Sequence, residues 1–373
     1  MRIGIITISE HNNYGNRLQN YALQKFLLNY ADNVDTIWWC KDNYILNKKF
    51  NIKTAIKYLL NYKETRLYVD NKYIKDCIRE YNIKKFSDKY ISIKYDYTIN
   101  KNLSNKYSFF IVGSDQVWNT NFWAGWDSLV NTINAVFLKF VPQEKRIAYA
   151  ASIAIPEIPK DKKQIFKDSL NEMKVISMRE KAGAELVKNL TGREVPVVVD
   201  PTILLSKEEW QKIEMVPEWY NGEKYILTYF LGNSSSVIEN IAKKNNWKIY
   251  NLMDKDNFDL YTSRVEEFVY LIDHAQLIAT DSFHACVFSI LMGTPFLVVN
   301  RQQKGMADMT SRIDTLLELF GYHDRYIVNG KCELSDKGIL NMDFSRVKAI
   351  QEREKKRSKD FLEKALNLKV SDR

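Results

Sequence analysis

The sequence predicts an α/β protein made of two units, in each of which short buried strands alternate with helices. A first series opens with the apolar run 2–9, and a second opens with the run 224–232. The stretch 206–223 between them is polar and contains Pro217 and Gly222, which is typical of a domain boundary. We therefore expect three regions: residues 1–205, residues 223–345, and a charged amphipathic terminal helix over residues 346–373.

The composition is that of a soluble globular protein. The 373 residues are 45% hydrophobic and 27% charged, and no run approaches the ~20 apolar residues of a membrane span. The four cysteines are far apart without a CxxC pair, and the four histidines are isolated, so no disulfide or metal site is expected. Residues 2–9 are typical of a strand and not of a signal peptide, which indicates a cytoplasmic protein.

One segment carries the net charge. Residues 41–106 contain 16 Lys or Arg and 7 Asp or Glu, which accounts for the whole net charge of +9. Apolar residues recur there at helical spacing, so we interpret the segment as a helical insert. It is either a solvated helical face or a peripheral contact with anionic membrane lipid or a lipid-diphosphate acceptor. No nucleic-acid motif accompanies the charge, so nucleic acid is not an expected partner.

Polar residues follow the strands of the first unit, at the edge where open α/β sheets bind ligands. Gly15 and Asn16 begin the first helix, where the backbone can approach an anion or a sugar, although Gly15 is equally explained as a turn glycine. The GxGxxG fingerprint is absent, so a dinucleotide is not indicated. After a later strand, Asp115, Gln116 and Trp118 supply a carboxylate, an amide and an aromatic face, the set that grips a sugar. The alternative is an Asx turn with a packed indole.

Cationic residues also follow predicted strands. Arg179 lies where a strand turns into a helix, a place suited to clamping a carboxylate or phosphate, although a surface ion pair explains it equally well. Arg301 and Arg312 make the segment after the strand at 295–299 cationic.

The stretch 277–299 predicts a strand, a polar turn, a helix and a second strand. Asp281 or Ser282 can cap this helix, which places His284 at its positive N-terminal end. Histidine titrates near neutral pH, so His284 is the histidine best suited to acid–base chemistry. A packed or capping histidine is the simpler alternative.

Seven segments occur in this order along the chain: YGNRLQNYALQ, FIVGSDQVWN, RIAYAAS, ISMRE, VVDPTILL, TDSFHACVFSILMGTPF and MTSRIDTLL. Together they make the chain resemble the polysaccharide pyruvyl transferase family. The resemblance extends from the first strand to about Phe320 and leaves out the basic insert and the terminal helix. It implies a GT-B-like fold, in which two Rossmann-like domains face each other across a cleft and the last helix crosses back.

The family moves the enolpyruvyl group of phosphoenolpyruvate onto two hydroxyls of a sugar, forms a cyclic ketal and releases phosphate. The resemblance implies such an activity in the synthesis of a bacterial surface polysaccharide, such as an exopolysaccharide or capsule, with a galactose-type residue of a lipid-linked oligosaccharide as the acceptor and no cofactor. It identifies His284 as the acid–base catalyst and Arg179 as a donor-binding residue. The first-unit residues 15, 16, 115, 116 and 118 would then contact the acceptor.

The chain departs from the family at one position. Many members have Arg-Leu-His at the histidine motif, whereas this chain has Ser282-Phe283-His284. Ser282 therefore stands at the donor site without a charge, and Arg301 or Arg312 would hold the donor instead. Two alternatives stay open: a GT-B glycosyltransferase that uses a nucleotide sugar, and a non-catalytic binding member of a polysaccharide assembly complex.

Overall fold

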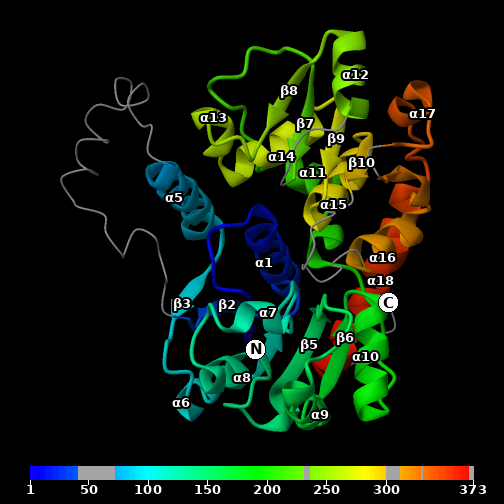
Figure 1. The fold of residues 1–373 in the computed structure, drawn as a ribbon. Helices are drawn as coiled ribbons and strands as arrows, with labels where there is room; N and C mark the ends of the chain where they lie inside the picture. Colours follow the sequence, from blue (N-terminus) through cyan, green and yellow to red (C-terminus); the bar gives the residue numbers. More distant parts are fainter. Residues whose placement is uncertain (41–71, 231–235, 300–310, 329–330, 369–373) are drawn as a thin grey trace, which may run out of the picture.

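The computed structural model describes residues 1–40, 72–230, 236–299, 311–328 and 331–368 (Figure 1). Arg301 lies outside the described residues, and so does the part of the basic segment from 41 to 71. The described chain forms two parallel sheets with helices around them, which confirms the predicted α/β class.

The N-terminal sheet has six parallel strands in the order 3-2-1-4-5-6, which is the doubly wound order of dinucleotide-binding folds. Its switch point, where the strand order reverses, lies between β1 and β4. The strands are β1 (Arg2–Ile6), β2 (Asn33–Trp38), β3 (Ile93–Tyr95), β4 (Phe109–Val112), β5 (Arg146–Ala151) and β6 (Val175–Met178). The helices are α1 (Tyr14–Leu27), α5 (Lys72–Tyr90), α6 (Lys101–Ser104), α7 (Thr120–Trp123), α8 (Leu129–Val136), η1 (Gln143–Lys145), η2 (Lys160–Lys162), α9 (Lys163–Asn171), α10 (Lys181–Thr191) and η3 (Pro201–Leu204).

The C-terminal sheet has five parallel strands in the order β11-β10-β9-β7-β8, with a switch point between β7 and β9. Its strands are β7 (Tyr225–Tyr229), β8 (Lys248–Asn251), β9 (Leu277–Thr280), β10 (Phe296–Val299) and β11 (Tyr326–Ile327). Its helices are α11 (Lys207–Gln211), α12 (Ser236–Asn245), α13 (Phe258–Tyr261), α14 (Val265–Asp273), α15 (Phe283–Met292), α16 (Ser311–Phe320), η4 (His323–Arg325) and α17 (Asp336–Leu340).

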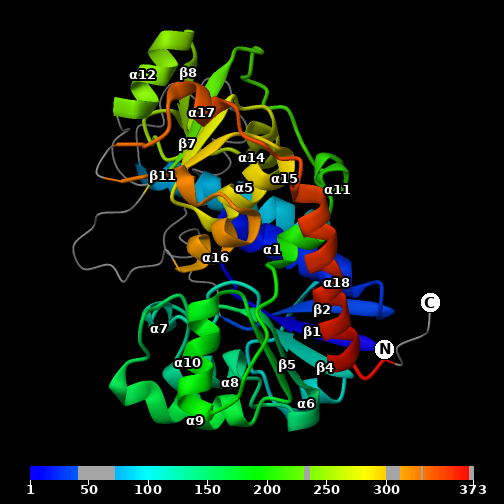
Figure 2. The ribbon, with the colours of Figure 1, turned by 90° about the vertical axis from the view of Figure 1, so that its right-hand side faces the viewer.

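The strands are the short β-branched and aromatic runs that the sequence shows, and both faces of each sheet are covered by helices (Figures 1 and 2). The central strand β1 is buried from Ile3 onward. Residues 195–205 contribute only an isolated bridge, Met178 to Val197, and then the short helix η3. Pro196 and Pro201 limit pairing here, because proline cannot donate to a strand ladder.

The terminal helix α18 (Val347–Ala365) crosses back from the C-terminal sheet to the N-terminal one (Figure 2). Gln351 donates hydrogen bonds of 2.8 Å to the carbonyls of Ile203 and Leu205. Near the other end of the helix, Lys174 donates to the carbonyl of Ala365. The helix therefore ties the end of the chain to the N-terminal sheet and its neighbouring loops.

The described part of the basic segment joins the two halves. Helix α5 packs on α1, and it also contacts α13 and α14 of the C-terminal half. Arg79 is buried there, donates to the carbonyls of Leu252 and Tyr261, and stacks against the rings of Tyr14 and Tyr261. A solvated helical face is therefore not the right description of residues 72–90.

Candidate active site

The loops after β1 and β9 meet where the two sheets face each other. Gly15 and His284 are packed so closely that a Cβ atom on residue 15 would lie 2.1 Å from Nδ1 of His284. Only glycine leaves room for this ring. Ser282 caps α15 by accepting a hydrogen bond from the amide of Ala285, so His284 lies in the first turn of a helix, as predicted. His284 is 5% exposed, and its Nε2 forms no hydrogen bond within the described residues.

Asp200 is the centre of the buried polar network. Its Oδ1 accepts hydrogen bonds from the amide and the hydroxyl of Thr202, and its Oδ2 accepts from Ser114 and from Arg179 Nη1 at 2.8 Å. The same Oδ2 lies 3.7 Å from His284 Nε2, a distance for an ion pair but not for a hydrogen bond. Burial alone would raise the pKa of the Asp200 carboxyl, but His284 and Arg179 hold it far below its usual range.

Arg179 joins two carboxylates. Besides Asp200, it donates from Nη2 to Oδ1 of Asp115 at 3.3 Å, and the three side chains are buried. Burial alone would raise the pKa of the Asp115 carboxyl, but the nearby Arg179, His284 and Arg312 keep it below its usual range. Asp115 is therefore ionised, and its Oδ2 accepts no hydrogen bond from the described residues.

Arg312 is a buried cation that forms no ion pair with any residue that the structure describes. It lies in the first turn of α16, is 8% exposed, has no hydrogen-bond partner for Nε in the described ranges, and its guanidinium carbon lies 5.9 Å from the centre of the Phe283 ring. Burial, and then the nearness of Arg179, lower the pKa of its guanidinium to about 10. A buried charge without a partner is costly, so this position is suited to an anion that binds from outside.

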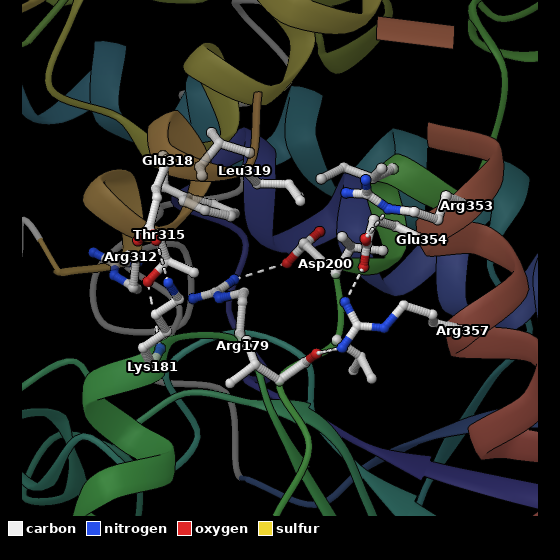
Figure 3. A pocket seen from close by; sticks show the side chains of 16 residues that line it. Arg179, Lys181, Asp200, Arg312, Thr315, Glu318, Leu319, Arg353, Glu354 and Arg357 are labelled. Carbon is white, nitrogen blue, oxygen red and sulfur yellow. Dashed lines mark hydrogen bonds and ion pairs between the residues drawn. The ribbon is translucent and has the colours of Figure 1, made fainter. Parts of the chain in front are cut away.

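A pocket of about 350 Å³ lies between α10, α16 and α18 (Figure 3). Arg179 and Arg312 line it, with Asp200 at its centre, and His284 lies 3.7 Å from Asp200 Oδ2 without being one of the lining residues. Its lining residues are Arg179, Lys181, Val197, Val198, Val199, Asp200, Ile203, Phe283, Arg312, Thr315, Leu316, Glu318, Leu319, Arg353, Glu354 and Arg357.

Several predicted acceptor residues have structural roles. The structure corrects the predicted sugar contact of Trp118. Its side chain is fully buried, stacks on Phe137 and donates to the carbonyl of Val136, so its ring faces the core and not a sugar. Asn16 is buried with its side-chain oxygen bound by Arg17. Gln116 is half-buried and accepts a hydrogen bond from Asn119.

Sequence reasoning missed Asp200 as well as Arg353 and Arg357. Asp200 directly follows the valines of 197–199, so the rule that singled out Asp115 after its strand would also have found it. The two arginines lie on a helix whose charges look like an ordinary solvated face, and no local signal marks them.

Outside this site, Glu214, Asp273 and His274 hold potential metal-ligand atoms within 4.8 Å of one another, so His274 is not isolated as predicted. Lys207 already donates to Asp273 at 2.7 Å, which satisfies much of that charge. No helix in the described ranges has the length and apolar character needed to cross a bilayer.

Two parallel α/β halves that meet at a buried network of acid, histidine and arginine side chains give the chain a GT-B-like architecture. The particular family follows from the sequence. A model of the polysaccharide pyruvyl transferase family matches residues 13–303, and the chain belongs to that family. No curated protein matches the chain.

Solved structures with similar folds share little sequence with this chain. UDP-N-acetylglucosamine 2-epimerase from Rickettsia bellii is 10% identical over 98% of this chain and 97% of its own, with a TM-score of 0.45. UDP-GlcNAc 2-epimerase from Neisseria meningitidis is 11% identical over 96% and 94%, with a TM-score of 0.42. MurG from Acinetobacter baumannii is 9% identical over 98% and 99%, with a TM-score of 0.41. Nothing about substrates follows from these likenesses.

Proposed function

We propose that the chain transfers the enolpyruvyl group of phosphoenolpyruvate to two hydroxyls of one sugar residue and forms a cyclic pyruvate ketal. The observation that carries the proposal is the buried Arg312, which pairs with no acid among the described residues and lies beside Arg179 in a pocket large enough for a small anion. Membership of the family supports the reaction class.

In this proposal, Arg312 is the main residue that binds the negative charge of the donor. Arg179 already uses one N–H of each terminal nitrogen on Asp200 and Asp115, so it contributes positive potential and can donate only from its remaining N–H groups, of which Nε has no partner among the described residues. Ser282 brings no charge and serves as the cap of α15. Arg312 is thus the described residue that best replaces the arginine missing at position 282.

The chemistry needs a proton at C3 of the donor and a stabilised cation at C2. His284 delivers that proton, since its unbonded Nε2 is the nitrogen directed at the network. The carboxylate of Asp200 stabilises the positive charge of the protonated imidazole. The two acceptor hydroxyls add to C2, the bond from C2 to the phosphate oxygen breaks, and phosphate leaves. Of the two hydroxyl protons, one balances the proton gained at C3 and the other leaves on the phosphate.

The acceptor lies on the N-terminal side. Asp115 is ionised and keeps Oδ2 for a sugar hydroxyl, and the backbone at Gly15 lines the approach beside His284. A galactose-type residue of a lipid-linked precursor is the acceptor we propose, with the basic segment of residues 41–106 as the peripheral contact with a membrane. Residues 72–90 of this segment form α5, which packs against the C-terminal half.

The test is phosphate release from phosphoenolpyruvate in the presence of a panel of galactosides and N-acetylmannosaminides. We expect release only when an acceptor is present, with the mass of one pyruvyl ketal gained by that acceptor. Thermal protection by UDP or CMP, with none by phosphoenolpyruvate, would instead favour a nucleotide-sugar glycosyltransferase.

A further inference from the structure

The pocket has two cationic walls. Arg179 and Arg312 reach it from one side, and Arg353 and Arg357 of α18 reach it from the opposite side, with Asp200 between them (Figure 3). The second wall comes from a helix that the family match, residues 13–303, does not cover.

The arginines of α18 are held by one buried carboxylate. Glu354 is 2% exposed, and it accepts a 2.9 Å hydrogen bond from Arg353 Nε and a 2.8 Å bond from Arg357 Nη1. Arg357 also donates from Nη2 to the carbonyl of Val197, so both of its terminal nitrogens are engaged. Arg353 uses only Nε, and its two terminal nitrogens have no partner within the described chain.

The acids of the pocket are already neutralised. Asp200 is paired with Arg179, and Glu354 lies between two arginines. The guanidinium groups that no acid engages at their terminal nitrogens among the described residues are Arg312 on one wall and Arg353, whose side chain is 59% exposed, on the other. A guanidinium fork matches a carboxylate or a phosphate with two parallel hydrogen bonds. The pocket is complementary to a small molecule that has an acidic group at each end.

We propose that α18 contributes a ligand-binding side chain to the donor site, where Arg353 binds one acidic group of phosphoenolpyruvate while Arg312 binds the other. This assignment rests on the proposed function, because that function supplies the two-headed donor. It gives the terminal helix a direct role in donor binding, in addition to its structural contacts with the N-terminal sheet.

The test compares Arg353→Gln with Lys356→Gln in the full chain, by calorimetric titration with phosphoenolpyruvate and, separately, with inorganic phosphate. Lys356 is a matched control, because it carries the same charge on the same helix, is 76% exposed and does not line the pocket. Arg357 still holds Glu354 in the Arg353→Gln variant, so the helix keeps its anchor. We expect Arg353→Gln to raise the Kd for phosphoenolpyruvate about tenfold or more, and Lys356→Gln to change it by less than about twofold.

Inorganic phosphate separates a two-headed ligand from a general effect of charge. We expect its affinity to depend on Arg353 much less than that of phosphoenolpyruvate does. Unchanged binding of phosphoenolpyruvate by Arg353→Gln, an equal loss for both ligands, or an equal loss in the Lys356 control would each overturn the assignment. If Arg353→Gln proves unstable, Arg353→Lys keeps the charge but removes the fork, and it must still weaken phosphoenolpyruvate binding.

Failure of this assignment can be told apart from failure of the proposed function. Phosphate release by the unmodified chain supports the function whatever Arg353→Gln does. Binding that depends on Arg353, without phosphate release on any acceptor, would refute the function and keep the donor wall. No binding of phosphoenolpyruvate to the unmodified chain would refute both.

Discussion

Replacing Asp200 by Asn tests the centre of the buried network. The change keeps the size of the side chain, and Oδ1 can still accept from Thr202. The amide nitrogen, however, would point at Arg179 Nη1, so two donors would face each other and a buried cation would lose its nearer partner. Breaking such a pair costs about 3 to 5 kcal/mol. Asp115 still lies 3.3 Å from Arg179, so we expect a loss near the low end, about 3 kcal/mol.

Thermal unfolding at pH 7 measures this loss, and about 3 kcal/mol corresponds to a decrease in Tm of roughly 4 °C for a chain of 373 residues. The pH dependence gives a second check. The pKa of Asp200 is depressed in the folded chain, so its contribution is full above the unfolded pKa of about 4 and declines as pH falls below it. The difference in stability between the two chains should therefore narrow below pH about 4.

Asp161→Asn is the matched control, because this carboxylate is 72% exposed and pairs with Lys162 at the surface. We expect the Tm of this variant to equal that of the unmodified chain within the error of the measurement. If Asp200→Asn were as stable as the unmodified chain at pH 7, or no worse than the control, the reasoning that Asp200 compensates a buried Arg179 would be wrong.

Three further outcomes follow from the site and the domain contact. Gly15→Ala places a Cβ atom 2.1 Å from Nδ1 of His284, so we expect turnover to fall by at least about tenfold, whereas Gly338→Ala, whose nearest neighbour is 3.4 Å away, should leave it unchanged. Arg312→Gln removes the buried cation that pairs with no acid among the described residues, so we expect the affinity for phosphoenolpyruvate in calorimetry to fall about 10- to 100-fold without a loss of Tm. A lower Tm with unchanged affinity would contradict this expectation. Arg79→Gln removes a buried cation that donates to two carbonyls, and the chain should unfold with about 2 to 4 kcal/mol less stability in urea; an unchanged midpoint would show that this contact does not hold the halves together.

The sequence predicted the fold because buried strands and helices alternate in it with clear periods. The sequence also identified Arg179, His284 and Arg312 as candidate site residues, and the structure places them around one network. They could be identified because polar residues that follow parallel strands gather at the carboxyl edge of each sheet. Gly15 and His284 come from different halves, and their contact could be inferred only from the family resemblance.

The remainder depends on packing that local sequence does not encode. An indole beside polar turn residues has the same sequence appearance whether it faces a sugar or the core, and Trp118 faces the core. Arg79 looks like one more charge in a basic segment, yet burial between two tyrosines makes it an interdomain contact. Arg353 reaches the pocket only because α18 crosses the molecule, which helical periodicity does not reveal.

The most direct measurement of the central claim is the mass of a galactoside acceptor after incubation with phosphoenolpyruvate and either the unmodified chain or His284→Ala. We predict that the unmodified chain adds one pyruvyl ketal and releases one phosphate for each acceptor, and that His284→Ala does neither while keeping its Tm and its phosphoenolpyruvate affinity. Full turnover by His284→Ala, or ketal formation without phosphoenolpyruvate, would contradict the account.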